Sequence, residues 1–163
     1  MKYEFCPRCG SRLSTAELDG VERGRCDSDG CGFVHWDNPV PVAAVLLEHE
    51  GGVVLVRAPG WPESWFGLVT GFVERHESPA ETALRELREE LGLDGEIVSL
   101  IGSYAFRPMN QVIIAYHVRA AGEIRASDEI AAWKRIPIEK LRPWPQGTGE
   151  AVRDWLAARI AQP

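Results

Sequence analysis

The chain has 163 residues, 45% of them hydrophobic, which suits one main domain with room for a small appendage. Its formal net charge of −6 argues against a general nucleic-acid-binding protein, and an anionic substrate would need a cation or local Arg and Lys side chains to approach. The sequence has neither a run of 18 apolar residues nor an apolar secretory signal, so we expect a cytoplasmic protein without a membrane span.

All four cysteines fall in the first 31 residues, as the pairs Cys6/Cys9 and Cys26/Cys31 with sixteen residues between the pairs. Two short loops that each give two thiolates to one tetrahedral Zn²⁺ have this kind of spacing, although the second loop is longer than usual. Two disulfides are the alternative, which a reducing cytoplasm disfavours. Because about 35 residues cannot bury enough core to fold unaided, we expect a structural Zn²⁺ to stabilise a module of residues 1–36.

The second domain is expected to span residues 37–163, after a linker rich in turn-forming residues. Two β-favouring runs, at residues 42–48 and 53–56, predict a hairpin around a Gly-Gly turn. A further strand is predicted at residues 65–70. This part of the chain should therefore begin as a sheet.

Residues 78–92 carry the signals of a helix. Ser78 suits the N-cap, Pro79 suits the first helical position, and Glu81 completes a capping box. Gly92 can end the helix in left-handed geometry. Between these signals lies one apolar stripe at helical spacing, formed by Ala80, Ala83, Leu84, Leu87 and Leu91.

Three acidic residues, Glu86, Glu89 and Glu90, share a second face of this helix, beside the apolar stripe. On an average helix such a face is simply solvated. Acids that stand next to a buried stripe, rather than opposite it, indicate the edge of a cleft. Carboxylate oxygens clustered in this way suit Mg²⁺ or Mn²⁺.

The chain then returns to strand patterns, which predict strands at residues 96–101, 111–119 and 133–136. Residues 103–110, between the first two of these strands, are predicted to be an irregular aromatic segment. One helical turn is expected at residues 137–141, and Thr148 can cap a last amphipathic helix. Strands with one internal and one terminal helix predict α/β or α+β packing around a central sheet.

The stretch from Gly71 to Leu93 also resembles a complete Nudix box. It has Gly71, five residues, Glu77, seven residues, and then Arg85-Glu86-Leu87-Arg88-Glu89-Glu90-Leu91-Gly92-Leu93. The resemblance implies an α/β/α sandwich over about residues 40–160 and hydrolysis of nucleoside diphosphates linked to another group. The cysteine pairs are similar to the N-terminal module of NADH pyrophosphatases and of some ADP-ribose/FAD pyrophosphatases.

The same resemblance implies metal ligands in the box. Glu89 and Glu90 would hold Mg²⁺ or Mn²⁺, and Glu86 would be a further ligand or the base that deprotonates the attacking water. The backbone carbonyl of Thr70 would complete the metal sphere.

Two supporting roles follow from the family pattern. Arg85 and Glu77 would pair and brace the loop against the helix, whereas an ordinary surface ion pair would contribute under ~1 kcal/mol. Many family members add a carboxylate from a late loop, for which Glu129 is our first candidate and Asp128 our second. A solvated loop acid is the alternative.

The sequence says less about which substrate is bound than about the metal ligands. The motif that marks NADH pyrophosphatases is matched at residues 103–111 only by its first serine and one aromatic residue, so we do not expect NADH specificity. Phe66, Tyr104 and Phe106 could stack on a base, and Arg107 could meet a phosphate. Aromatic side chains beside a sheet are, however, more often part of a core.

Three functions remain open from the sequence. The leading one is Mg²⁺-dependent hydrolysis of a small-molecule nucleotide such as ADP-ribose, FAD or NAD(H). The second is removal of a nucleotide cap from RNA by the same chemistry, and the third is a non-catalytic ligand sensor or nucleic-acid-binding module. The intact box argues against a sensor, and five basic against six acidic residues in positions 1–36 argue against nucleic-acid binding. A homodimer is one of the assemblies that the sequence allows.

Overall fold

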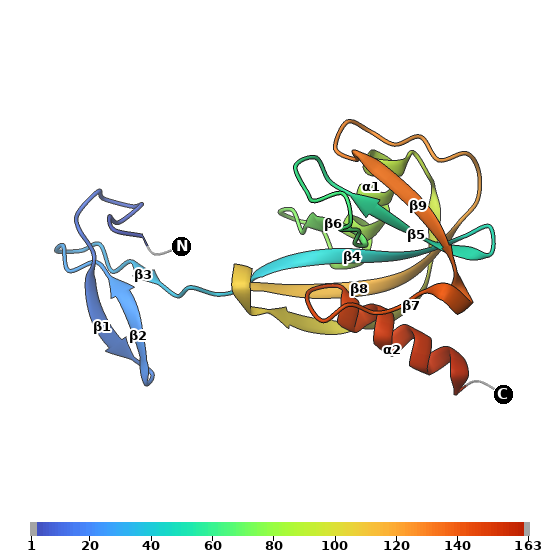
Figure 1. Cartoon of the computed structure of the whole chain (residues 1–163). Helices are drawn as coiled ribbons and strands as arrows, with labels where there is room; N and C mark the ends of the chain where they lie inside the picture. The colour runs from blue at the N-terminus through green and yellow to red at the C-terminus, as the bar shows by residue number, and fades with distance from the viewer. Residues whose placement is uncertain (1–2, 162–163) are drawn as a thin grey trace. The chain divides into compact units, whose positions relative to one another are not determined.

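The computed structural model describes residues 3–161 and divides the chain into two compact units, Met1–Pro39 and Val40–Pro163 (Figure 1). None of the helices in these described residues is long and apolar enough to cross a membrane.

The N-terminal unit is a small antiparallel sheet whose strands the sequence had not indicated. Its interior is poor in apolar side chains, because among the described residues of this unit only Leu13 and Phe33 pack against the buried cysteines. A unit with so small a core needs another source of stability. Its strands are β1 (Ser14–Leu18), β2 (Val21–Arg25) and β3 (Val34–His35).

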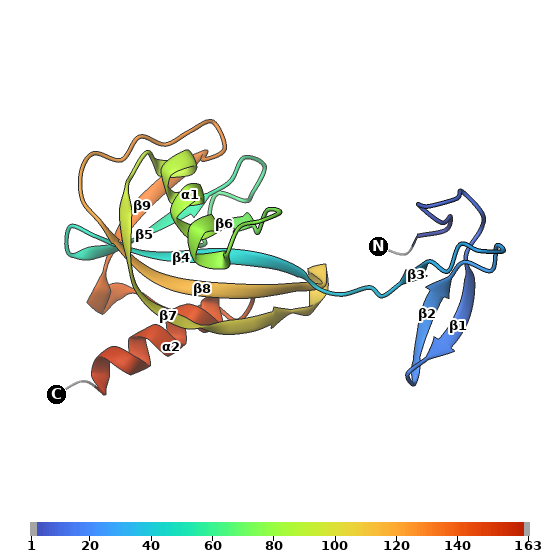
Figure 2. The same ribbon diagram turned by 180° about the vertical axis from the view of Figure 1, so that it is seen from behind.

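The C-terminal unit is built on a six-stranded mixed sheet in the order β7-β8-β4-β5-β9, with β6 paired to β4 (Figure 2). The central strand β4 runs parallel to β8 and antiparallel to β5 and β6. The strands are β4 (Val40–His49), β5 (Gly52–Arg57), β6 (Val69–Phe72), β7 (Gly95–Phe106), β8 (Gln111–Ala120) and β9 (Ala132–Pro137). The helices are α1 (Pro79–Leu91) and α2 (Gly149–Ile160), with one-turn 3-10 helices η1 (Arg107–Met109) and η2 (Ile138–Lys140).

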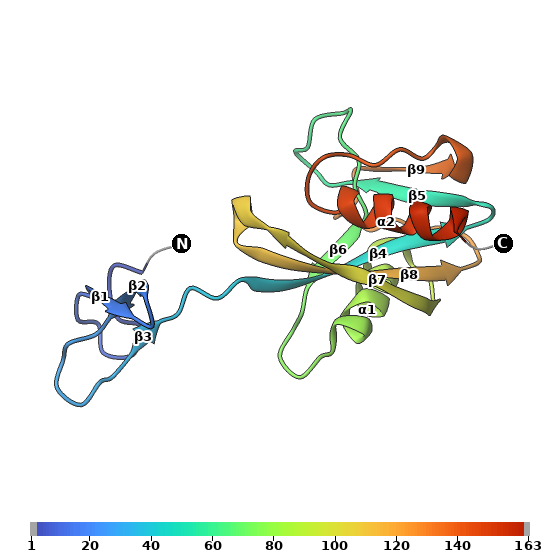
Figure 3. The same cartoon turned by 90° about the horizontal axis from the view of Figure 1, so that it is seen from below.

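The two α-helices cover opposite faces of this sheet, as Figure 3 shows from below. Side chains of β4 alternate between the faces, as the two-residue period of a strand requires. Val45 and Leu47 pack with α1, whereas Ala44 and Leu46 pack with α2. All four are fully buried. The predicted α/β/α sandwich is confirmed.

Helix α1 begins and ends where the sequence predicts. The N–H of Glu81 donates to Ser78 Oγ (3.3 Å), and the N–H of Ser78 donates to the Glu81 carboxylate (2.8 Å), which completes the capping box. Gly92 ends the helix with φ +67°. Leu87 and Leu91, on the predicted stripe, are fully buried against the sheet.

Two expectations about the strands are wrong in part. Residues 103–110 are not irregular, because β7 continues to Phe106 in register with β8. Two register shifts in β7, at Ile97/Ser99 and Leu100/Gly102, fall at the predicted part of the strand, whereas the unpredicted residues 103–106 pair regularly with β8. The strand predicted at 65–70 starts only at Val69.

The last helix also differs in one detail. Thr148 occupies the N-cap of α2, but its side chain makes no capping hydrogen bond. Its backbone carbonyl accepts the N–H of Val152 at 3.3 Å.

Candidate active site

The acidic face of α1 lies against β6. Gly71, on the face of β6 that points to α1, allows this approach, because a Cβ there would overlap the Glu86 carboxylate. Glu86 is partly buried and Glu89 is exposed. The first glycine of the box is therefore required by the close packing of strand and helix.

Arg85 links the box loop to the helix through one guanidinium group. Its Nε and Nη2 donate to the two carboxylate oxygens of Glu77, at 2.7 and 3.1 Å. Its Nη1 donates to Glu86 at 2.7 Å and to Glu89 at 2.8 Å, and its Nη2 also donates to the Phe72 carbonyl at 3.2 Å. The hydrogen bond from Arg85, aided by Thr82, holds the pKa of Glu77 at about 2. The pair therefore stays charged at any working pH.

Glu90 is the most buried acid of the cluster, with 8% of its surface exposed. Its Oε2 atom is buried and has no hydrogen-bond partner among the residues that the structure describes. Burial, and then the charges of Glu86, Glu129 and Glu89, raise its pKa to about 8. A buried carboxylate without a donor, among other carboxylates, is the environment that a divalent cation would satisfy, so the side chains fit Mg²⁺ or Mn²⁺.

The raised pKa of Glu90 predicts how the stability of the metal-free protein changes with pH. Its pKa is about 8 when folded against an ordinary 4.5, so between these values the folded chain holds a proton that the unfolded chain has released. Stability should then fall as pH rises from 5 to 8. Thermal unfolding in the presence of a chelator should show a lower Tm at pH 8 than at pH 6, and Glu90→Gln should flatten this dependence. An equal drop in the wild type and the variant would contradict the assignment.

The loop before β9 brings Glu129 to this cluster. The N–H of Ser127 donates to the Glu90 carbonyl (2.9 Å), and the N–H of Arg125 donates to the Leu91 carbonyl (2.8 Å), so the loop caps the C-terminal end of α1. The charge of Glu129 raises the pKa of both Glu86 and Glu90. The structure thus places our first loop candidate within electrostatic reach of the box acids.

The box loop contains one strained residue. His76 has φ +72°, in the left-handed region that only glycine adopts without cost. His76→Gly should raise stability by about 0.5–1 kcal/mol, or a Tm increase of about 2–5 °C. Arg75→Gly is the matched control, because Arg75 is not among the residues with positive φ and should lose stability on the same change. A Tm that fell in both variants would contradict this account.

A pocket of about 980 Å³ opens on the α2 side of β6. Thr70, the proposed carbonyl ligand, lines it beside Gly71. Of the predicted binding residues, Phe66 and Phe106 line the pocket. Its volume suits a nucleotide-sized ligand.

Two other predicted binding residues are not brought to this pocket. The Tyr104 hydroxyl donates to Asp154 of α2 at 2.9 Å, which holds its ring in the core beneath the helix. Arg107 begins η1 and does not belong to the pocket lining. Tyr104 lies in the continuation of β7, and Arg107 lies in the 3-10 turn that follows it, so neither belongs to the predicted irregular segment.

The sequence analysis missed several residues of the pocket. Trp61 and Trp65 are exposed although they are large and apolar. Their positions in a turn-rich loop, where no core is expected, were the available signal. The missed lining residues with aromatic or cationic side chains are Trp61, Trp65, Phe72, Lys134, Lys140, Arg142 and Trp144.

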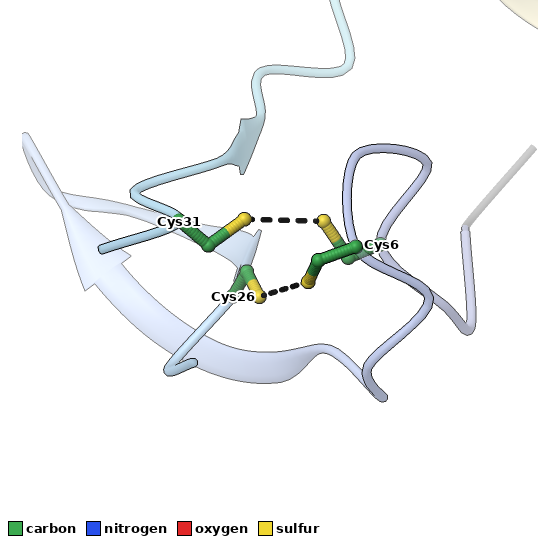
Figure 4. Close-up of side chains that lie close together, drawn as sticks. Cys6, Cys26 and Cys31 are labelled. Carbon is green, nitrogen blue, oxygen red and sulfur yellow. Dashed lines mark hydrogen bonds between the residues drawn. The ribbon is translucent and has the colours of Figure 1, made fainter. Parts of the chain in front are cut away.

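The four cysteines of the N-terminal unit meet at one point (Figure 4). The sulfur atoms of Cys6 and Cys31 are 3.6 Å apart, and those of Cys9 and Cys26 are 3.4 Å apart. All four sulfurs lie within 4.8 Å of one another, and all four residues are free cysteines. Thiolates at about 2.3 Å from a tetrahedral Zn²⁺ would stand about 3.8 Å apart, so the cluster has the size of a zinc site.

Comparison with known proteins places this arrangement in context. Residues 37–156 match the NUDIX domain family. The chain is 29% identical over 143 residues to the NAD-capped RNA hydrolase NudC of Pseudomonas aeruginosa (strain LESB58), covering 86% of this chain and 50% of the relative. The corresponding protein of Stutzerimonas stutzeri (strain A1501) is 26% identical over 167 residues, covering 99% of this chain and 59% of the relative. The chain thus spans about half the length of these curated relatives.

Solved structures show the same fold. A NUDIX hydrolase from Nitrosomonas europaea superposes with a TM-score of 0.80 at 22% identity, covering 99% of this chain and 94% of the other. An ADP-ribose pyrophosphatase from Streptococcus suis 89-1591 superposes with a TM-score of 0.62 at 19% identity, covering 77% and 96%.

Proposed function

Because the chain belongs to the Nudix family, we propose that it hydrolyses the pyrophosphate bond of nucleoside diphosphates linked to another group. ADP-ribose, FAD and NAD(H) are the proposed substrates. The observation that carries the proposal is the buried Glu90 carboxylate, which has an unpartnered oxygen and three acidic neighbours. Gly71, which packs against one of these neighbours, Glu86, also lines the nucleotide-sized pocket. A sensor would not need these intact acids.

Glu86, Glu89, Glu90 and Glu129, with the Thr70 carbonyl, are the groups proposed to hold Mg²⁺ or Mn²⁺. The bound ions would neutralise the pyrophosphate and acidify a water molecule. Glu86 has a pKa raised by burial, which suits either a ligand or a base that takes a proton from that water. Arg85 and Glu77 hold the loop that shapes the site and do not need to touch the substrate.

We also propose that Cys6, Cys9, Cys26 and Cys31 bind one structural Zn²⁺. The four sulfurs already lie at the separation that a tetrahedral ion requires. The N-terminal unit would then be the zinc ribbon predicted at residues 1–36, followed by the hydrolase domain predicted at residues 37–163. The two units have separate interiors, which is consistent with this division.

Removal of an NAD cap from RNA is the second candidate, because the curated relatives carry that activity in their name. The reaction at phosphorus would be the same. The near balance of acidic and basic residues in positions 1–36 does not favour RNA binding by the ribbon. RNA binding would therefore have to come from the C-terminal unit.

A substrate panel with Mg²⁺ tests the proposal: ADP-ribose, FAD, NADH and an NAD-capped oligonucleotide. AMP should appear as the common product of the three small molecules. Because residues 103–111 match the NADH motif poorly, kcat/KM for NADH should lie within a hundredfold of that for ADP-ribose or FAD. A hundredfold preference for NADH, or ~2.7 kcal/mol, would overturn this specificity, and the absence of any hydrolysis would overturn the function.

A further inference from the structure

The pocket is lined by basic residues, although the chain as a whole is acidic. Although acidic residues outnumber basic ones by 24 to 18, no acidic residue lines the pocket among the described residues, whereas Lys134, Lys140 and Arg142 do. Unpaired cations in a pocket of this size favour an anionic ligand.

The three cations differ in how they are held. Arg142 Nη1 donates to the backbone carbonyls of Glu139 and Leu141, both at 2.8 Å, so it stabilises its own loop. Lys134 and Lys140 form no ion pair within residues 3–161. Lys134 instead places its Nζ 3.8 Å from the centre of the Phe66 ring, inside the pocket. A lysine held over an aromatic ring remains able to bind an anion.

The position of Lys134 separates it from the metal site. Phe66, which fixes its ammonium group, lies five residues before Gly71, or up to about 16 Å along an extended chain. Lys134 itself belongs to β9, two strands away from β6, in register with Leu55 of β5. The acids of α1 meet β6 at Gly71. Lys134 is thus held at Phe66, and no ion pair joins it to the acids of α1 within residues 3–161, which favours a role toward a part of the substrate other than the bond that would be cleaved.

We propose that Lys134 and Lys140 form a subsite for a phosphate carried by a ribose of the substrate, in addition to the pyrophosphate that is hydrolysed. This inference rests on the proposed function, because it assumes that the pyrophosphate lies at the Gly71 end of the pocket. The base would then contact the aromatic wall near Phe66, and a phosphate on the neighbouring ribose would reach the two ammonium groups. A 2′-phosphomonoester and a 3′-phosphodiester that continues into RNA share this chemistry.

The test compares matched substrates in the full chain. Wild type, Lys134→Gln and the double variant with Lys140→Gln are assayed on NADH, on NADPH and on a short NAD-capped oligonucleotide. Arg135→Gln is the control, because Arg135 is the next residue of β9, lies outside the pocket lining and pairs with Glu50 at 2.6 Å. The double variant should lose about tenfold in kcat/KM on a substrate with the additional phosphate, should change little on NADH, and the control should change neither.

Each outcome has a defined meaning. A loss confined to NADPH identifies the 2′-phosphate, a loss confined to the oligonucleotide identifies the 3′-phosphodiester, and a loss on both supports a shared subsite. An equal loss on NADH, or no loss on any substrate, overturns the inference. Hydrolysis of ADP-ribose by the wild type and the double variant at equal rates would show that the proposed function stands even then.

Binding provides a readout that is independent of hydrolysis. Calorimetric titration of the wild type should show adenosine 2′,5′-bisphosphate or adenosine 3′,5′-bisphosphate binding about tenfold more tightly than AMP, and the double variant should lose this difference. If both bisphosphates bound no better than AMP, the subsite would not exist. If one did bind better while no substrate was hydrolysed, the subsite would stand and the proposed function would fail.

Discussion

Glu90→Gln is expected to lower kcat about a thousandfold while leaving the fold intact. The substitution keeps the size and shape of the side chain but removes the charge that a divalent ion needs. Stabilisation of the transition state by such an ion is worth several kcal/mol, and about 4 kcal/mol corresponds to three orders of magnitude in rate. Glu90 is the least exposed of the four acids, and its Oε2 atom has no hydrogen-bond partner in the described structure. Its charge is therefore available to the metal ion, and the variant would lose that interaction.

Stability should change in the opposite direction. Burial, and then the charges of Glu86, Glu129 and Glu89, disfavour an ionised Glu90 in the folded protein, so a side chain that is always neutral avoids the cost of taking up a proton on folding without metal. Glutamine is nearly as good a helix former as glutamate, and α1 should persist. A site that is destabilised in order to hold a metal is a common form of the conflict between stability and activity.

The measurement is kcat as a function of Mg²⁺ concentration, with thermal unfolding followed in parallel. Glu96→Gln is the control, since Glu96 is an exposed acid on β7 and its replacement removes the same charge away from the site. Glu90 would not be a metal ligand if the variant kept the wild-type kcat and the same Mg²⁺ dependence.

The parts of this molecule that were predictable depend on local interactions. The capping box of Ser78 and Glu81 and the left-handed end at Gly92 involve residues a few positions apart, and the structure confirms them. The apolar stripe of α1 also follows from sequence spacing alone. The positions of Glu86, Glu89 and Glu90 on this helix follow from the same spacing.

The parts that could not be predicted depend on tertiary contacts. Lys134 reaches Phe66 only because β9 pairs with β5, and Tyr104 turns to Asp154 only because α2 covers β7. No local spacing encodes either contact. Residues 103–106 were missed for the same reason, since they join β7 through pairing with β8, which is also a tertiary contact. The residues that line the pocket are consequently harder to predict from sequence than the helix that carries the acids of the box.

Removal of zinc is expected to unfold the N-terminal unit and to leave the C-terminal unit folded. The interior of the N-terminal unit consists of three buried cysteines with Leu13 and Phe33, so it has little apolar area to offset the entropy of folding. Zinc bound by four thiolates supplies apparent free energies on the order of 10 kcal/mol or more in small zinc modules. The C-terminal unit has its own two-layered core and does not share these contacts.

Purified protein should contain about one zinc per chain, which metal analysis can measure. After removal of zinc by a chelator, or in Cys6→Ser, hydrogen exchange and limited proteolysis should show lost protection in residues 3–39 and unchanged protection in β4 and β8. Ser28→Ala is the matched control, because Ser28 lies in the loop between Cys26 and Cys31 and its hydroxyl donates to Ser11 Oγ at 2.7 Å. The substitution removes this hydrogen bond but keeps all four thiolates. Equal protection of residues 3–39 with and without zinc would mean that the sheet and the small apolar interior stabilise this unit without the metal.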